Sequence, residues 1–438
     1  MRKAICLLLF TVSLPLVAFE RQPNADYRDR RMQLASKLDK GSLALVFANS
    51  EAEGQNATGG FRQNDDFYYL TGWNEPGAAV LIAPASDAHP YREILFLPAH
   101  NKTQERWTGP KLGAESPEAA RTTGFDKVEV LDRMRDEIVE LLPNPSATIY
   151  TDSAPHSPAA TPLEWLKRAN AFPNYTSWRD SGALVGDLRV TKDAREIALI
   201  TKATDATVEA HKAAMRNAKP GMTENELAAI MRYEFERRGC EIEAYAPIVG
   251  SGFNSTVLHY SQNSGTMNAG DLVVLDVGGE YSRYATDVTR TLPVNGRFTP
   301  RQREIYDIVL GAQKAAVDAF KAGVSTMNRT SPNSLYKIAY DYINTHGKDL
   351  HGQPLGQYFI HGLSHYVGLA VHDSGNRDAP LSAGAVFTIE PGIYIPEEKL
   401  GVRIEDTYVV GNDGALVCLS CRAPKTAGEV EALMAVRR

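Results

Sequence analysis

The chain has 438 residues, of which 43% are hydrophobic and 23% charged, and these are ordinary values for a soluble globular protein. The composition excludes collagen-like, coiled-coil and disordered chains, and the length predicts two or three domains. Lysine and arginine number 47 against 53 acidic residues, for a formal net charge of -6. Because this balance provides no basic field to hold a phosphate backbone, we expect no nucleic-acid partner.

Residues 1–18 have the order of a secretory signal peptide. The basic pair Arg2 and Lys3 precedes a mostly apolar run over 4–16, which ends in Val17 and Ala18. The run is shorter than the ~20 residues that span a bilayer. We therefore expect cleavage near Ala18 and an exported protein, periplasmic or secreted, with an uncleaved anchor as the alternative. No later segment is apolar and long enough to form a membrane helix.

Three cysteines remain after the signal, which carries Cys6. Cys418 and Cys421 form a single Cys-x-x-Cys pair without a second pair or nearby histidines, which is poor evidence for zinc. We expect a local disulfide between them and a buried Cys240.

Residues 19–185 alternate strand-like and helical patterns, which predicts an N-terminal α/β domain. The expected strands are 43–47, 78–82 and 93–97, and the expected helices are 131–142 and 163–166. Small, turn-forming residues over 180–187 predict a linker before a long helix from about Thr191. A second domain over 186–438 follows, and the fold class is α+β.

The second domain contains an internal duplication. Residues 210–223 match residues 312–325 at an offset of 102, with six of fourteen positions identical. Residues 269–278 match residues 383–392 at an offset of 114. Two copies are too few for a solenoid, so we expect an αβ half that packs on its twin. In the first copy, Thr223 and Glu226 predict a capping box, and the helix that they begin ends near Gly239.

Acidic residues recur at equivalent places in the two copies. The apolar strand 272–275 is predicted to end in Asp276, and the strand 386–389 in Glu390. Asp287 and Glu405 follow in strand-like sequence. An unpaired buried carboxylate is unfavourable by several kcal/mol, so four such groups in two pairs indicate two divalent cations, which would neutralise them.

A fifth ligand is expected to be His365, one of three histidines within 361–373. Imidazole with carboxylates suits manganese, iron, cobalt or zinc, and an oxygen-dominated set favours manganese. Other motifs are absent from the sequence: there is no His-Glu-x-x-His helix, no phosphate-binding loop, and no Gly-x-Ser-x-Gly turn around Ser364.

These residues lie in blocks that resemble the pita-bread metallopeptidases, and most of all aminopeptidase P, the Xaa-Pro aminopeptidase. The blocks of the second domain are 258–260, 275–278, 285–291, 361–373, 388–392 and 401–406. The N-terminal domain of that family is also resembled, by residues 63–76 and 107–113. The likeness covers nearly all of the chain after the signal.

The resemblance implies a role for each matched residue. Asp276, Asp287, His365, Glu390 and Glu405 would bind two manganese ions, or cobalt or zinc, with Asp287 and Glu405 bridging them. The corresponding catalytic and substrate-binding residues are His259, His361 and His372, with Arg403 and Tyr394 behind them. Trp107 matches an aromatic residue that can reach the site of a neighbouring subunit, so a homo-oligomer, a dimer or tetramer, is expected. Arg377 lies on a shortened loop, where it could hold a substrate carboxylate.

The expected reaction is removal of the N-terminal residue from peptides that have proline in the second position. In it Glu390 would take the proton of a water, and His361 would stabilise the oxyanion. Three alternatives use the same fold: an Xaa-Pro dipeptidase, a methionine aminopeptidase, which lacks this large N-terminal domain, and a non-catalytic binding module, which would have lost ligands.

Overall fold

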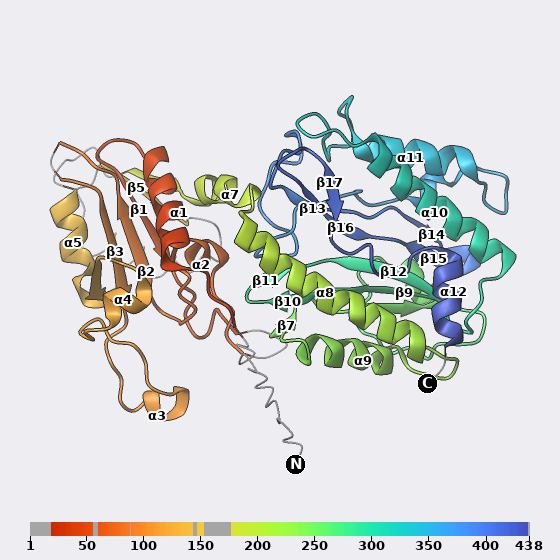
Figure 1. The fold of residues 1–438 in the computed structure, drawn as a ribbon, viewed down its shortest axis with the longest axis horizontal. Helices are drawn as coiled ribbons and strands as arrows, with labels where there is room; N and C mark the ends of the chain where they lie inside the picture. The colour runs from red at the N-terminus through yellow and green to blue at the C-terminus, as the bar shows by residue number, and fades with distance from the viewer. Residues whose placement is uncertain (1–18, 56–59, 88, 143–146, 153–176, 437–438) are drawn as a thin grey trace, which may run out of the picture.

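The computed structural model describes residues 19–55, 60–87, 89–142, 147–152 and 177–436. The expected signal peptide and the expected helix over 163–166 lie outside these ranges. The described chain forms a smaller N-terminal part and a larger C-terminal part, joined through α7 (Gly182–Val190) (Figure 1).

The N-terminal part is built on a six-stranded mixed sheet with the order β4-β3-β2-β1-β5-β6. The strands are β1 (Leu43–Phe47), β2 (Ala79–Ala83), β3 (Arg92–Leu97), β4 (Lys127–Val130), β5 (Thr148–Thr151) and β6 (Ser177–Asp180). β1 pairs antiparallel with β2 and parallel with β5. The three predicted strands are confirmed to within one residue at each end.

The central strands are apolar throughout because helices cover both faces of the sheet. Ala44 and Val46 join one core with α1 (Asn24–Lys37) and α2 (Asp65–Thr71). Leu43 and Leu45 point the other way, into a core with α5 (Met134–Leu141), which follows a short turn of 3-10 helix over Leu131–Arg133. The helical prediction over 131–142 is therefore confirmed. Two short helices, α3 (Glu105–Thr108) and α4 (Ala119–Thr123), complete this part.

The segment over 180–187, predicted to be a linker of turn-forming residues, lies where the two parts join, but most of it is helical and belongs to α7. Val185 is fully buried, and Leu184 and Leu188 pack against the core. This burial outweighs the low helix propensity of the glycines in the segment. The long helix then begins close to the expected place, as α8 (Ala194–Asn217), with Asp193 as its N-cap.

The C-terminal part shows the predicted duplication in its topology. In the first copy β9 (Leu272–Val277) pairs with β12 (Val288–Pro293), and β10 (Gly279–Tyr281) with β11 (Tyr284–Ala285). In the second copy β13 (Val386–Ile389) pairs with β16 (Asp406–Val410), and β14 (Gly392–Ile395) with β15 (Leu400–Arg403). The remaining strands are β7 (Ile242–Glu243), β8 (Ile248–Ser251) and β17 (Leu416–Cys418).

The helices of this part lie outside the strands (Figure 1). α8 and α9 (Glu224–Glu236) belong to the first copy, α10 (Pro300–Ala319) and α11 (Leu335–His346) to the second, and α12 (Ala427–Ala435) closes the fold. The predicted capping box is confirmed, because Thr223 and Glu226 bond reciprocally at the start of α9. None of the helices within the described ranges is long and apolar enough to cross a membrane.

Partly buried ion pairs join the two parts. Arg62, next to α2, contacts Glu280 of β10 at 2.9 Å. Arg189 of α7 contacts Asp66 of α2 at 2.6 Å and also pairs with Asp373 in the C-terminal part.

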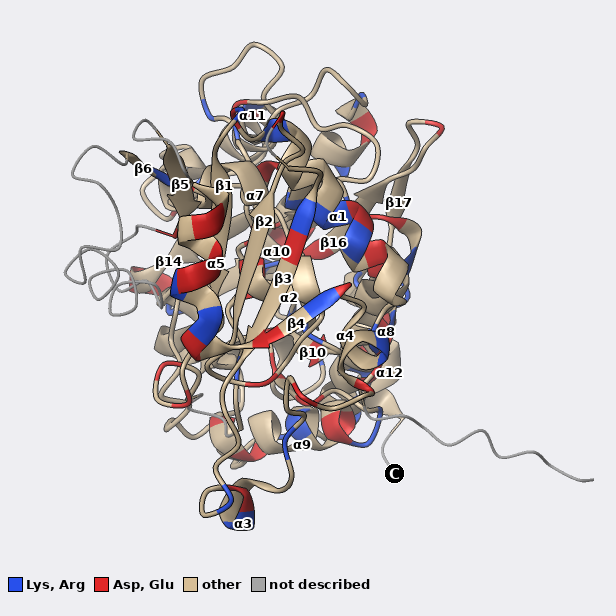
Figure 2. Cartoon of the chain, turned by 90° about the vertical axis from the view of Figure 1, so that its left-hand side faces the viewer, with Lys and Arg blue, Asp and Glu red and all other residues tan. Residues whose placement is uncertain are grey.

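On the face seen in Figure 2, basic and acidic residues are interspersed along α1 and α5.

Candidate metal centre

A cavity of about 410 Å³ opens where the two copies meet. It is lined by side chains from both: Tyr245, His259, Asp276 and Asp287 from the first, and His361, His365, His372, Arg377, Glu390 and Arg403 from the second. Glu405 lies beneath the cavity floor and is 1% exposed. All five predicted ligands therefore converge on one place.

Breaks in the strands position most of these acidic groups. Asp287 stands between β11 and β12, and Glu405 occupies the equivalent break between β15 and β16. Glu390 follows the end of β13, as predicted. Asp276 differs from the prediction, because β9 continues through it and pairs it with Thr289 of β12 and Ile248 of β8. Hydrogen bonds on both edges of the strand therefore fix its backbone.

His365 is oriented toward the carboxylates. Its Nδ1 lies 3.1 Å from the Tyr366 carbonyl and donates to it, which leaves Nε2 as the nitrogen that is free to bind a metal. Nε2 lies 3.4 Å from Asp287, 3.5 Å from Glu390 and 4.0 Å from Glu405. Ligand atoms of Asp287, His365 and Glu405 all lie within 4.8 Å of one another.

The carboxylates repel one another when no cation lies between them. Burial and the neighbouring Asp276 raise the pKa of Asp287 well above its usual value. Burial and Asp287 do the same to the pKa of Glu405, and burial with Glu405 raises the pKa of Glu390 to about 8. Burial also acts on Asp276, but Arg403 and Tyr245 outweigh it and lower its pKa.

Among the described residues, one buried oxygen of this set has no hydrogen-bond partner, Glu405 Oε1. Its other oxygen accepts from the Thr289 hydroxyl at 2.7 Å. A buried carboxylate oxygen without a partner is unfavourable, and a bound cation would satisfy it. The donor set, four carboxylates and one imidazole nitrogen, fits divalent cations such as manganese.

Comparison with known proteins identifies the family. Residues 198–412 match the model of metallopeptidase family M24, and residues 27–150 match the aminopeptidase P N-terminal domain. The chain is 35% identical to the Xaa-Pro aminopeptidase of Escherichia coli K12, over 94% of this chain and 98% of that protein. The chain belongs to the aminopeptidase P family of pita-bread metallopeptidases. It is therefore an enzyme, a hydrolase of the M24 fold that uses a divalent metal.

Solved structures agree with this family. The proline aminopeptidase P II of Yersinia pestis superposes with a TM-score of 0.83 at 33% identity, covering 95% of this chain and 100% of that one. The E. coli aminopeptidase P, solved with the inhibitor Pro-Leu, gives a TM-score of 0.83 at 32% identity and covers 95% of this chain and 99% of that one.

Behind the candidate ligands of this aminopeptidase P family site, a chain of hydrogen bonds links Arg403, Tyr394 and His361. Arg403 donates to the Tyr394 hydroxyl at 2.7 Å, and that hydroxyl lies 2.8 Å from His361 Nε2. His361 Nδ1 in turn lies 2.7 Å from the Gly362 carbonyl. Burial and Arg403 lower the pKa of His361 to about 3, so the ring is neutral. Tyr394 is buried behind His361 and supports it rather than lining the cavity.

The other predicted residues are divided between the cavity and the surface. His259, His372 and Arg377 line the cavity, and the His372 ring meets the His365 ring edge-on at 4.3 Å between centroids. Burial and His365 lower the pKa of His372 to about 4. Trp107 does not line this cavity, because it lies on α3, which projects from the N-terminal part, and it is 88% exposed (Figure 1).

Sequence reasoning missed Tyr245. Its hydroxyl lies between two candidate ligands and donates at 2.6 Å to Asp276 or at 2.5 Å to Asp287. It comes from the segment between β7 and β8, where no repeat or periodic pattern marks it. Thr289 was also missed, although it lies in the matched block 285–291.

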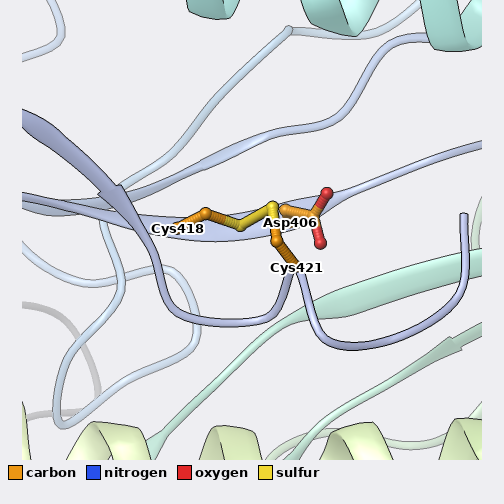
Figure 3. A group of neighbouring side chains, drawn as sticks. All are labelled: Asp406, Cys418 and Cys421. Carbon is orange, nitrogen blue, oxygen red and sulfur yellow. A yellow bond between two sulfur atoms is a disulfide. The ribbon is translucent and has the colours of Figure 1, made fainter.

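The Cys-x-x-Cys pair is no metal site, since Cys418 and Cys421 form the predicted disulfide (Figure 3). The carboxylate of the neighbouring Asp406 forms ion pairs with Arg290 at 2.7 Å and with Lys425 at 2.9 Å. Cys240 is buried and free, as predicted.

Proposed function

We propose that this enzyme removes the N-terminal residue from peptides with proline in the second position, using two divalent cations, manganese first among them. The observation that carries the proposal is the convergence of four carboxylates and His365 Nε2 at the base of one cavity. The names of the relatives, which are Xaa-Pro aminopeptidases, support the substrate class.

A peptide bond to proline lacks an N–H group and has a fixed φ. Enzymes that recognise backbone hydrogen bonds around the scissile bond therefore cleave it poorly, and a dedicated site needs another source of rate, such as metal ions. Asp276, Asp287, His365, Glu390 and Glu405 would hold the cations. When bound, the cations lower the pKa of a water molecule and polarise the scissile carbonyl. The cations also oppose the mutual repulsion that raises the pKa of the carboxylates.

The chain's own groups would then move the proton and hold the charge. Glu390 lies 3.5 Å from His365 and faces the cavity, so we assign it the proton of the attacking water. His361 Nδ1 lies 3.7 Å from Glu390. We propose that His361 Nδ1 stabilises the oxyanion of the transition state. To do so, it would give up its hydrogen bond to the Gly362 carbonyl and donate to the oxyanion instead. The free amine of the substrate would lie at the Asp276 end.

Export and oligomerisation belong to the same proposal. The order of residues 1–18 supports an exported enzyme. A large aromatic side chain that is 88% exposed, Trp107, supports a homo-oligomer, a dimer or tetramer, in which it contacts another subunit.

The experiment is a peptide panel with controlled metal. Purified mature enzyme, stripped of metal and reloaded with manganese, cobalt or zinc, is given Xaa-Pro-Yaa, Xaa-Ala-Yaa and Xaa-Pro peptides. Release of Xaa from Xaa-Pro-Yaa, dependent on added metal, is expected. Cleavage of Xaa-Pro dipeptides alone would replace the proposal with a dipeptidase, and metal-independent turnover would refute the dimetal site.

A further inference from the structure

A buried carboxylate outside the cavity holds the loop that carries His259. The loop spans residues 252–271, between β8 and β9, and we call it the His259 loop. Glu224, the first residue of α9, is fully buried against this loop. No residue of the metal site contacts it.

Five hydrogen bonds converge on the Glu224 side chain. Its Oε1 accepts from the amide and hydroxyl of Ser251, both at 2.8 Å, and from the Asn254 side chain at 3.1 Å. Its Oε2 accepts from the Tyr260 hydroxyl at 2.8 Å and the Gly265 amide at 2.7 Å. Burial alone would raise the pKa of Glu224, but the donors, Ser251 first, lower it, so the carboxylate is ionised at neutral pH.

These donors surround His259 in the chain. Ser251 and Asn254 lie before it, Tyr260 follows it directly, and Gly265 lies beyond it. The helix N-terminus favours the negative charge of Glu224, and the Glu224 amide returns a bond to the Gly265 carbonyl at 2.9 Å. Glu224 therefore holds the loop at its start, directly after its histidine and at Gly265.

The His259 ring itself has no such support. Within the described part of the chain, its side chain takes part in no hydrogen bond, whereas both nitrogens of His361 are engaged. Its place at the cavity wall is therefore set by the backbone of the loop. A shift of about 1 Å in a group that contacts substrate can lower a rate about 100-fold.

We propose that Glu224 is a positioning residue that acts through His259. This inference rests on the proposed function and on the role that the family resemblance implies for His259, which lines the cavity and would contact the substrate there. Other contacts hold the loop as well: Asn263 bonds Val249 and Pro247, and Ser255 bonds Gly401. Arg403 also donates to the carbonyl of Leu258, on the other side of His259, at 3.5 Å. None of these groups bonds the Tyr260 side chain, so Glu224 is the group outside the loop that fixes the residue directly after the histidine.

Two substitutions of Glu224 should lower kcat/KM to different extents. Glu224→Gln keeps the shape but turns an amino group toward a backbone amide, Gly265 or Ser251, and we expect kcat/KM to fall about tenfold. Glu224→Ala leaves all five donors without their acceptor and should lower it further. Manganese content should stay at the wild-type value in both, because the ligands lie on other segments.

The deciding test is a double-mutant cycle with His259→Ala on an Xaa-Pro-Yaa substrate. Each Glu224 variant should divide its loss between kcat and KM as His259→Ala does, and should cause no further loss in the His259→Ala background. A full additional loss there would overturn the proposal, as would normal turnover in Glu224→Ala. A purely structural defect would persist in both backgrounds.

The matched control is Glu226→Ala, in the same helix turn. Glu226 caps α9 through Thr223 and bonds nothing in the His259 loop, so its loss should lower stability and leave kcat/KM within twofold. If Glu224→Ala does not fold, Glu224→Gln and Tyr260→Phe, which removes one hydroxyl, enter the same cycle. Wild-type enzyme that ignores Xaa-Pro peptides would contradict the proposed function; normal turnover in His259→Ala would contradict the role of Glu224 alone.

Discussion

Arg403 of the second copy reaches across the cavity and binds Asp276 of the first copy, at 2.6 Å between Nη2 and Oδ2. The pair joins the two halves of the duplication at the metal site, and both residues are buried. Arg403 is also the start of the chain of hydrogen bonds through Tyr394 to His361. One guanidinium therefore supports a candidate ligand and a candidate catalytic histidine together.

We expect Arg403→Gln to destabilise the metal-free enzyme by about 3 kcal/mol, because it leaves the buried Asp276 carboxylate without its cation. Manganese would supply the missing positive charge, so it should stabilise the variant more than the wild type. Chemical denaturation with and without manganese measures both differences. Equal metal stabilisation of the two proteins would mean that Arg403 and the cations do not share Asp276.

Removing either of two central ligands should abolish metal-dependent turnover. We expect Asp287→Ala and Glu405→Ala each to lower kcat/KM at least 100-fold, about 2.7 kcal/mol, and to lower bound manganese, because both approach His365. The metal-free variants should be no less stable than the metal-free wild type, since each change removes a buried carboxyl group whose ionisation burial and a neighbouring carboxylate disfavour.

His372→Ala is the contrasting variant for these ligands. It should keep the wild-type metal content while lowering turnover, since its ring packs on His365 rather than facing the carboxylates. Elemental analysis of the three purified variants, with steady-state kinetics, distinguishes the two patterns. Full metal occupancy and normal turnover in Asp287→Ala or Glu405→Ala would show that the five-ligand assignment is wrong.

The fold's pH dependence should reveal His211 of α8. This buried ring bonds the Val288 carbonyl at 2.9 Å, and burial, then Arg290, lowers its pKa to about 3. In the unfolded chain His211 binds a proton below about pH 6.5, whereas in the folded chain it stays neutral until about pH 3. The free energy of unfolding therefore falls as the pH drops below about 6.5. Between pH 8 and pH 5 the loss is about 2 kcal/mol.

His211→Gln keeps a donor for the Val288 carbonyl and removes the titration. The difference in unfolding free energy between wild type and variant should therefore shrink by about 2 kcal/mol from pH 8 to pH 5. His346→Gln, an exposed residue of α11, is the control for loss of a histidine. A difference that does not change with pH would mean that His211 is not kept neutral by the fold.

The disulfide should stabilise the end of the chain. Closing the four-residue loop from Cys418 to Cys421 removes unfolded-state entropy worth about 2 kcal/mol, and Ser420, inside the loop, bonds Asp406 at 2.6 Å. We expect Cys418→Ser combined with Cys421→Ser to lower the unfolding free energy by that amount. A reductant should destabilise the wild type and leave the double variant unchanged. Destabilisation of both proteins would point to another target of the reductant.

The site was predictable where the sequence repeats itself. Asp276 and Glu390 stand at equivalent places of two similar segments, and a buried strand rarely holds an acid without a counter-charge, so the pattern alone located them. Tyr245 and Glu224 carry no such mark, because each acts through a loop whose path depends on tertiary contacts. The helix over Gly182–Val190 was missed for the same reason, since burial of Val185 overrides the local glycines.

The part of the cavity beyond the substrate proline determines which peptide lengths can bind. A site for Xaa-Pro-Yaa must stay open beyond the proline, whereas a strict dipeptidase gains from a group that captures the proline carboxylate. The family resemblance implies that the loops after Asp373 and after Pro396 are shortened, which would leave that side of the cavity open. Arg377 is the basic group on the first of them, and it lines the cavity next to His372.

We expect Xaa-Pro-Yaa tripeptides to be cleaved with higher kcat/KM than the matching Xaa-Pro dipeptides under manganese. Replacing the proline by alanine should cost at least tenfold, about 1.4 kcal/mol of transition-state stabilisation. Arg377→Ala should weaken the dipeptides more than the longer peptides, because only a dipeptide places its carboxylate directly after the proline. A clear preference for dipeptides that disappears in Arg377→Ala would assign the enzyme to the dipeptidases, with Arg377 as the group that reads the carboxylate.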